Sequence, residues 1–200
     1  VCLVMRGPPG WTLFPYATLC RSQLRQLAAY AEDADFQAEW RRVKLENKAH
    51  LAKDIEQQTG LHLSTDMLFD VQVKRIHEYK RQLLNLLHAV HLYDRIRRGE
   101  DDGFVPRAII IGGKAAPGYV MAKNIIKAIN NVARIINSDT AMEGRLRLVF
   151  YPDYKVSAMA LICPAADLSE QLSTAGKAAS GTGHMKFMVN GAATIRQLDG

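Results

Sequence analysis

Cysteine is scarce in this sequence, and its three copies show no spacing that would bind a metal or form a redox pair. Cys2, Cys20 and Cys163 are far apart and odd in number, with no CxxC motif among the 200 residues. This pattern is typical of a reduced, intracellular protein and not of a disulfide-rich secreted one. The sequence therefore predicts no metal site and no disulfide framework.

Long hydrophobic runs are also missing. No apolar stretch approaches the roughly 20 residues that a membrane-spanning helix needs. Arg6, Pro8 and Pro9 interrupt the opening stretch, which makes it a poor signal peptide. We expect a cytoplasmic protein with no membrane contact. Residues 1–20 show no clean periodicity and stay unassigned, and the lack of an initial methionine predicts that the chain starts within a longer protein.

Charge of both signs is mixed along most of the chain, so the net charge of +6 is a modest excess. One local cluster stands out, the segment "VKRIHEYKR" at residues 73–81, where five basic residues accompany the single acid Glu78. Such a cluster favours an anionic ligand. A nucleic-acid binder is disfavoured, because aromatic residues for base stacking are not interleaved with the cations.

The order of the expected elements indicates an α/β fold. Helical spacing covers about 22–32 and 35–58, with Gly60 as a C-cap, and we assign 21–66 to a helical lead-in segment. Strands are predicted at 67–73, 107–113 and 145–151, and apolar stripes place helices between them. We therefore expect 67–200 to form a Rossmann-like domain, a parallel sheet with helices on both faces.

The predicted helix at 78–98 carries Leu83, Leu87 and Val90 on one face. The next helix carries a longer apolar stripe that includes Met121, Ile125 and Ile135. These two stripes are the sequence signals for helices that flank the sheet.

Three glycine- or lysine-rich segments fall where strands end and helices begin: "KRIHEYKR", "GGKAAPG" and "SGTGHMK". Ligands of parallel sheets bind at these ends. A P-loop is excluded because Ala115 follows Gly113-Lys114 and offers no hydroxyl for Mg²⁺. A dinucleotide fingerprint is excluded because Lys186 stands where its last glycine would be.

The segment "SGTGHMK" leaves two interpretations open. Gly181 and Gly183 could form a plain tight turn, with Lys186 as a solvated cation. Alternatively, the backbone N–H groups of Thr182 and Gly183 could face a phosphate, and a desolvated Lys186 could form a Schiff base. Pyridoxal phosphate would use both features, since it carries a phosphate and an aldehyde.

Four longer stretches carry a family resemblance: "MLFDVQVKRIHEYKRQLLN", "IIIGGKAAPGY", "PAADLSEQLSTAG" and "ASGTGHMKFMVNGA". They closely resemble the C-terminal, cofactor-binding portion of α-glucan (glycogen, starch and maltodextrin) phosphorylases, strongly over 67–198. The resemblance implies a pyridoxal 5'-phosphate-dependent glycosyltransferase with two Rossmann-like halves. Such an enzyme cleaves terminal α-1,4 bonds of a glucan with inorganic phosphate, releases glucose 1-phosphate with retention, and is expected to be a homodimer.

The resemblance also implies roles for individual residues. Those implied to hold the cofactor are Lys186 (Schiff base), Thr182, Gly183, Lys74 and Tyr154. Those implied to be catalytic are Lys74 and the pair that contacts the substrate phosphate, Arg75 and Lys80. Backbone contacts to the glucosyl ring are implied for Ser180 and Gly181.

The chain departs from the family pattern near these residues. Ala178 stands where the family usually has a glutamate that binds sugar hydroxyls, and His184 stands where it usually has a small polar residue. The sequence predicts a fragment of a longer enzyme, truncated at its C-terminal end and inactive alone. A non-catalytic anion-binding remnant of the same fold is the alternative.

Overall fold

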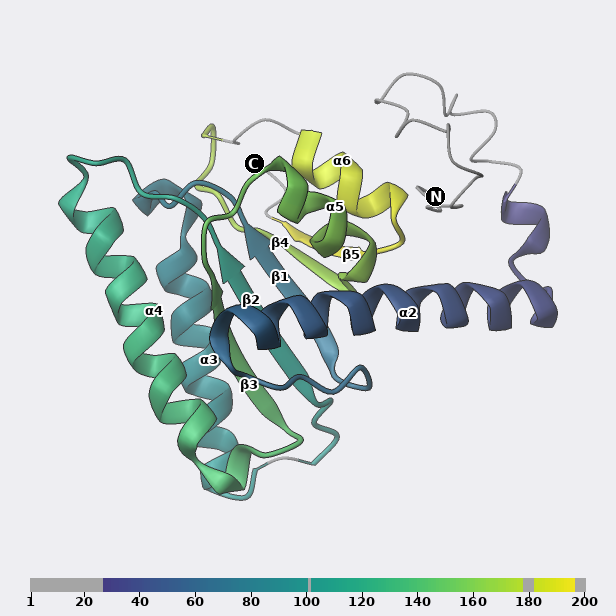
Figure 1. The fold of residues 1–200 in the computed structure, drawn as a ribbon, viewed down its shortest axis with the longest axis horizontal. Helices are drawn as coiled ribbons and strands as arrows, with labels where there is room; N and C mark the ends of the chain where they lie inside the picture. Colours follow the sequence, from purple (N-terminus) through teal and green to yellow (C-terminus); the bar gives the residue numbers. More distant parts are fainter. Residues whose placement is uncertain (1–26, 101, 178–181, 197–200) are drawn as a thin grey trace.

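The computed structural model describes residues 27–100, 102–177 and 182–196. Five parallel strands form one sheet in the order β3-β2-β1-β4-β5 (Figure 1). The strands are β1 (Leu68–Val73), β2 (Arg107–Gly112), β3 (Leu146–Tyr151), β4 (Leu168–Gln171) and β5 (Ala193–Arg196). The α-helices are α2 (Ala34–Thr59), α3 (Gln82–Arg97), α4 (Val120–Ser138), α5 (Val156–Ala165) and α6 (Thr182–Val189). The 3₁₀ turns are η1 (Leu27–Tyr30), η2 (Glu78–Lys80) and η3 (Thr140–Met142).

Helices cover both faces of the sheet, which confirms the predicted fold class (Figure 1). On one face α2, α5 and α6 pack against residues such as Phe69 and Val71 of β1. On the other face α3 and α4 pack against the alternate residues of β2, Ile109 and Ile111. This alternation follows from the period of two along each strand. The three strands predicted from apolar runs are thus confirmed, each buried from both sides.

Helix α2 shows how local sequence sets an element. It begins at the N-cap Asp33, whose carboxylate accepts from the backbone N–H of Asp35 at 3.0 Å and of Phe36 at 3.1 Å. It ends at Gly60, which has φ 73° and donates its N–H to the Glu56 carbonyl, as a C-cap glycine does. Of the helix predicted at 22–32, the described part is the short turn η1.

Two apolar stripes that the sequence places on helices differ in burial. On α4, Ile125, Ile129 and Ile136 are buried, whereas Met121 and Ile135, from the same predicted stripe, are exposed. On α3 the predicted face of Leu83, Leu87 and Val90 is exposed throughout.

The side of α3 that faces the sheet carries Gln82 and Asn85 as well as Leu86 and Ala89. Polar side chains can be buried there because they bond to β1 and to the loop that follows it, as the next subsection shows. No helix of the described residues is long and apolar enough to span a bilayer.

Candidate functional site

The sheet has a topological switch at β1. The chain runs from β1 outward through β2 to β3 and then returns to place β4 on the other edge of β1. In open parallel sheets, ligands bind in the crevice at the carboxyl ends of the two strands that flank such a point. The residue that follows β1 here is Lys74, one of the residues predicted from the sequence.

The Lys74 side chain joins the two strands at this switch. Its ammonium donates to the carbonyl oxygen of Glu170 at 3.0 Å and to Oε1 of Gln171 at 2.7 Å, both on β4. Burial and, to a smaller extent, the charge of Lys80 lower the pKa of Lys74 to about 8, while the charge of Glu170 opposes this shift. An ammonium has three N–H donors, so these two contacts leave one for a ligand.

The basic loop, residues 74–81, is held by hydrogen bonds to four neighbouring parts of the chain: β1, α3, and the segments that follow β2 and β4. Four such bonds fix its backbone: Ile76 N to Lys114 O at 3.1 Å, Gln82 Nε2 to Arg75 O at 3.1 Å, Gln72 Nε2 to Lys80 O at 3.2 Å, and Thr174 N to Tyr79 O at 2.9 Å. Arg81 closes the loop in the left-handed region, at φ 56°. The loop is therefore pre-organised before any ligand arrives.

Glycine is required at position 113, in the turn that follows β2 and packs against the basic loop. A Cβ built on Gly113 would lie 2.1 Å from the Lys74 carbonyl oxygen and 2.9 Å from Cδ1 of Ile76. The carbonyl belongs to the backbone, which cannot swing aside as a flexible side chain can. Gly113 thus lets the turn after β2 pack directly against the basic loop.

The cations of the loop repel one another. The pKa of Lys80 is lowered by burial and by the charge of Arg75, and the charge of Lys80 in turn lowers that of Lys74. No carboxylate of the described residues forms an ion pair with Lys74, Arg75 or Lys80. A bound anion would offset this repulsion, so the loop has the electrostatics of a phosphate site.

Tyr154 lies just beyond the carboxyl end of β3, a strand that β2 separates from β1. Its hydroxyl contacts Sδ of Met159 at 3.2 Å, its ring packs against the core beneath α2 and α5, and burial raises the pKa of the phenol. The preceding residue, Asp153, takes a positive φ of 45° and pairs with Lys114 at 2.6 Å and Lys155 at 3.0 Å. Lys114 is thus engaged by a carboxylate, unlike the cations of the basic loop.

Helix α6 carries the remaining predicted cofactor residues. It begins at Thr182, Gly183 follows, and Lys186 lies one turn later on the same face as Thr182. The partial positive charge of a helix N-terminus favours an anion beside its first turn. The predicted sugar contacts Ser180 and Gly181, together with Ala178, lie outside the described residues.

Helix α6 is anchored at its other end. The Asn190 amide donates to the Lys186 carbonyl at 2.8 Å and contacts Sγ of Cys163 on α5 at 3.4 Å. Gly191 follows with φ 78°, and a Cβ there would lie 2.4 Å from the indole of Trp40 on α2. Trp40 therefore fixes the turn that leads from α6 into β5.

Several residues of the site were missed from the sequence. Glu170 and Gln171, which bind Lys74, lie on β4, a strand that was not predicted. Two partners of Glu170, the buried Asp70 and the partly buried Arg107, lie on predicted strands but were not predicted as site residues. One signal could have found Asp70, since it is an acid inside the apolar run "LFDVQV". A buried acid in a strand needs partners and so marks a polar cluster.

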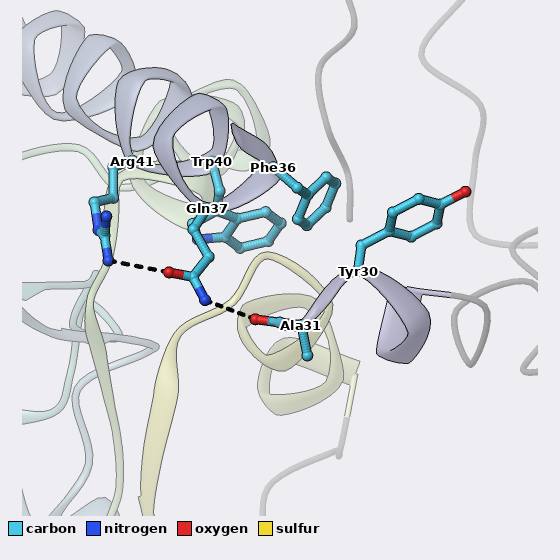
Figure 2. A pocket seen from close by; sticks show the side chains of 6 residues that line it. All are labelled: Tyr30, Ala31, Phe36, Gln37, Trp40 and Arg41. Carbon is cyan, nitrogen blue, oxygen red and sulfur yellow. Dashed lines mark hydrogen bonds between the residues drawn. The ribbon is translucent and has the colours of Figure 1, made fainter. Parts of the chain in front are cut away.

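A shallow aromatic hollow lies far from this site, at the start of α2 (Figure 2). Tyr30, Phe36 and Trp40 line it, with ring centroids 5.6 and 6.4 Å apart in succession. Its polar side chains bond within the hollow, Gln37 to the Ala31 carbonyl at 2.7 Å and Arg41 to Gln37 at 3.5 Å. The polar side chains drawn in Figure 2, Gln37 and Arg41, are thus bonded to other protein groups. Within the described residues, no group of three or more His, Cys, Asp or Glu could hold a metal.

The fold and the basic loop define an α/β domain of Rossmann type with a cluster of cations at its topological switch point. The carbohydrate phosphorylase family matches residues 17–200, and the chain belongs to that family.

Individual relatives agree. The chain is 53% identical over 178 residues to the muscle form of glycogen phosphorylase from Homo sapiens, which covers 89% of this chain and 21% of the relative. It is 55% identical over 178 residues to glycogen phosphorylase from Synechocystis sp., with the same coverage of 89% and 21%. It is 50% identical over 179 residues to glycogen phosphorylase from Chlamydia trachomatis, covering 90% and 22%. The chain thus spans about a fifth of the length of the curated relatives it matches.

Proposed function

We propose that this chain supplies the pyridoxal-phosphate-binding part of an α-glucan phosphorylase, the C-terminal one of two Rossmann-like halves. The reaction is phosphorolysis of terminal α-1,4-glucosidic bonds to give glucose 1-phosphate. The observation that carries the proposal is the basic loop at the switch point, where Lys74, Arg75 and Lys80 crowd together with no ion-paired carboxylate among the described residues. The names of the relatives support the same activity.

The residues present fit the cofactor. Lys74 has a spare N–H donor at the end of β1, α6 offers an N-terminus at Thr182 and Gly183, and Tyr154 provides an apolar ring nearby at the end of β3. In this proposal Lys186 holds the cofactor covalently, and Lys74, Thr182 and Gly183 hold its phosphate. When bound, the cofactor supplies a phosphate group that can give and take a proton.

The other cations would hold the second phosphate. Arg75 is exposed next to Lys74, and Lys80 is partly buried at the far end of the loop. Two phosphates that approach each other repel, and fixed cations in a partly desolvated site offset that repulsion with no reorganisation during the reaction. Arg75 and Lys80 thus bind and orient inorganic phosphate beside the cofactor.

The partners in this proposal are an α-1,4-glucan and inorganic phosphate, and the working form is a cytoplasmic homodimer. Serine and glycine backbone at Ser180 and Gly181 would contact the glucosyl ring. Ala178 stands where the family usually has a sugar-binding carboxylate. In a full-length enzyme that contains this chain, we therefore expect Ala178→Glu to raise kcat/KM by at least about tenfold, as a hydrogen bond to a charged group would.

Borohydride reduction followed by peptide mapping, made in a full-length enzyme that contains this chain, tests the proposal. We expect a pyridoxyl group on Lys186 and loss of the label in Lys186→Arg, with Lys177→Arg as the matched control that keeps it. A label on Lys114 or Lys123 would contradict the assignment of Lys186.

A paired assay of phosphate-dependent glucose 1-phosphate release, made in a full-length enzyme that contains this chain, separates the enzyme from its rival. Release that requires Lys186 supports the phosphorylase. Phosphate binding without cofactor uptake or release would identify an anion-binding remnant instead.

A further inference from the structure

Two carboxyl groups are buried side by side where β1 meets β4. Asp70 of β1 is 0% exposed and Glu170 of β4 is 4% exposed. Asp70 is in register with Leu168, so Glu170, two residues further along β4, faces the same side of the sheet. Helix α3 covers this side, and its Asn85 donates to Oε1 of Gln72 at 3.1 Å. The two acids are therefore enclosed by protein.

The charges around this pair do not balance if both acids are ionised. Arg107 of β2 contacts Oδ2 of Asp70 at 3.2 Å, and Oδ1 of Asp70 is buried with no donor among the described residues. The register places the Glu170 carboxyl beside Asp70 on the neighbouring strand, and each carboxyl shifts the pKa of the other. Two carboxylates cannot bond to each other, because both only accept, so a hydrogen bond between them needs one proton.

The contact with Arg107 decides which acid keeps that proton. Burial raises the pKa of Glu170 to about 8, with the charge of Asp70 as the next cause, and it raises the pKa of Asp70 to about 6. Arg107 opposes the rise at Asp70 more directly, because it contacts that carboxylate. At neutral pH, Glu170 is therefore the protonated partner and donates to Asp70.

The other elements around the pair contribute few charges. Strand β1 contributes Lys74, and β2 contributes Arg107. On α3, Nε2 of His88 lies 3.4 Å from Nη1 of Arg107, and burial lowers the pKa of His88, with the charges of Arg107 and His91 adding to the effect. Strand β5 places the apolar Ile195 in register with Glu170. Lys74 and Arg107 are thus the cations that sense the charge of the pair.

We propose that Asp70 and Glu170 share a single proton across the β1–β4 contact, and that Glu170 is thereby a positioning residue for anion binding by Lys74. The main-chain carbonyl of Glu170 holds the Lys74 ammonium, while its neutral side chain leaves the charge of that ammonium for the anion. An ionised Glu170 would instead offset the Lys74 charge and repel an anion. The inference rests on the proposed function only in taking that anion to be a phosphate group.

Sulfate titration at pH 7 tests this role, because sulfate does not change its charge between pH 6 and pH 9. In Glu170→Gln, a neutral amide replaces the acid and still donates to Asp70, so affinity should stay within about twofold of the wild type. In Asp70→Asn, the like charge that adds to burial in keeping Glu170 protonated is gone, so Glu170 should ionise more readily and sulfate affinity should fall about tenfold. Adding Glu170→Gln to Asp70→Asn should restore affinity, and the exposed Glu143→Gln is the neutral control.

Rescue in the double variant is the decisive result, since a merely structural defect of Asp70→Asn would persist or worsen. Failure of rescue, wild-type affinity in Asp70→Asn, or a tenfold loss in Glu170→Gln would each overturn the proposal.

Infrared spectroscopy provides a measurement that needs no Asp70 variant. The wild type should show a protonated carboxylic acid band at pH 7 that fades toward pH 9 and is missing in Glu170→Gln, and its absence in the wild type would refute the shared proton. Both measurements omit glucan and cofactor, so they can fail or succeed independently of the phosphorylase assignment.

Discussion

Strand β1 is bonded along both edges, but the two edges are built differently. Toward β2 it is in register over six residues, 68–73, and the facing strand is a run of buried isoleucines. Toward β4 the register covers Asp70 and Val71, and side chains extend the contact at each end. Asp167 accepts the backbone N–H of Phe69 at 2.8 Å and pairs with the buried Lys48 at 2.8 Å, while Lys74 reaches β4 at the carboxyl end.

The difference between these edges separates stability from chemistry. The β1–β2 edge buries apolar surface, which contributes to the free energy of folding whatever the pH. The β1–β4 edge depends on the protonation of Lys74, Asp70 and Glu170, whose pKa values are all shifted by burial. We therefore expect substitutions at the first edge to change unfolding and those at the second to change anion binding.

The largest effect should come from the apolar edge. Ile110 of β2 is 0% exposed, and Ile110→Ala should lower the free energy of unfolding by about 3–4 kcal/mol, because it removes buried methyl groups and leaves a cavity. Urea denaturation measures this loss, with the exposed Val105→Ala as the matched control. Sulfate affinity of the folded protein should not change, and a parallel loss of affinity would break the proposed separation.

A smaller effect is expected at Gly113, which follows β2 and packs against Lys74 at the end of β1. Gly113→Ala should lower the free energy of unfolding by about 2–3 kcal/mol, because its Cβ would overlap the Lys74 carbonyl. It should also weaken sulfate binding, since the basic loop must move. Gly118→Ala is the control, as a Cβ there meets nothing within 4 Å. Equal melting temperatures for the two variants would show that the loop yields without cost.

At the β1–β4 edge, stability and sulfate affinity should both depend on pH. The pKa of Lys74 is about 8 in the folded protein, below its ordinary value of 10.5. Between these two pH values the unfolded chain binds more protons than the folded one, so the contribution of Lys74 to stability rises with pH. Sulfate affinity should do the reverse and fall at least about fivefold between pH 8 and pH 9, as the ammonium loses its proton. Calorimetric titration checks this, and Lys74→Met should bind sulfate weakly at every pH. A flat wild-type profile would contradict the role of Lys74.

The smallest effect is expected on the outer face of α3. Leu87 is 57% exposed, so Leu87→Ala should change the free energy of unfolding by less than about 0.5 kcal/mol. Its neighbour Leu86 is 3% exposed, and Leu86→Ala should cost several times as much, about 2–3 kcal/mol. Chemical denaturation of both variants compares the two faces. Similar losses would mean that Leu87 is covered in solution.

Much of the fold could be predicted from local sequence. The strands at 68–73, 107–112 and 146–151 are apolar and rich in β-branched or aromatic residues, so their own composition identifies them. Strand β4, with the sequence "LSEQ", has no such signal, because its polar residues are paired by distant parts of the chain. The exposed leucines of α3 were a misleading signal for the face that packs on the sheet. Periodicity shows that a helix has two faces, but not which of them meets the sheet.

The site was predictable in part. The basic loop was found because its cations are adjacent in sequence, and the structure places Lys74 at the switch point as a ligand site requires. Glu170 and Asp70 were not found, because their pairing spans a hundred residues of sequence and depends on strand register. The roles of Lys186 and Tyr154 stay predictions, as do the domain boundaries at 21–66 and 67–200.

The position of β4 has a consequence for synthesis on the ribosome. Strands β1 to β3 and helices α3 and α4 occupy one continuous stretch, 68–151, and can pack as soon as it has emerged. Lys74 emerges early, but the carbonyl and amide that hold it belong to Glu170 and Gln171, almost a hundred residues later. Until then its ammonium has no partner across the sheet. A nascent chain therefore acquires its stable half before it can hold an anion.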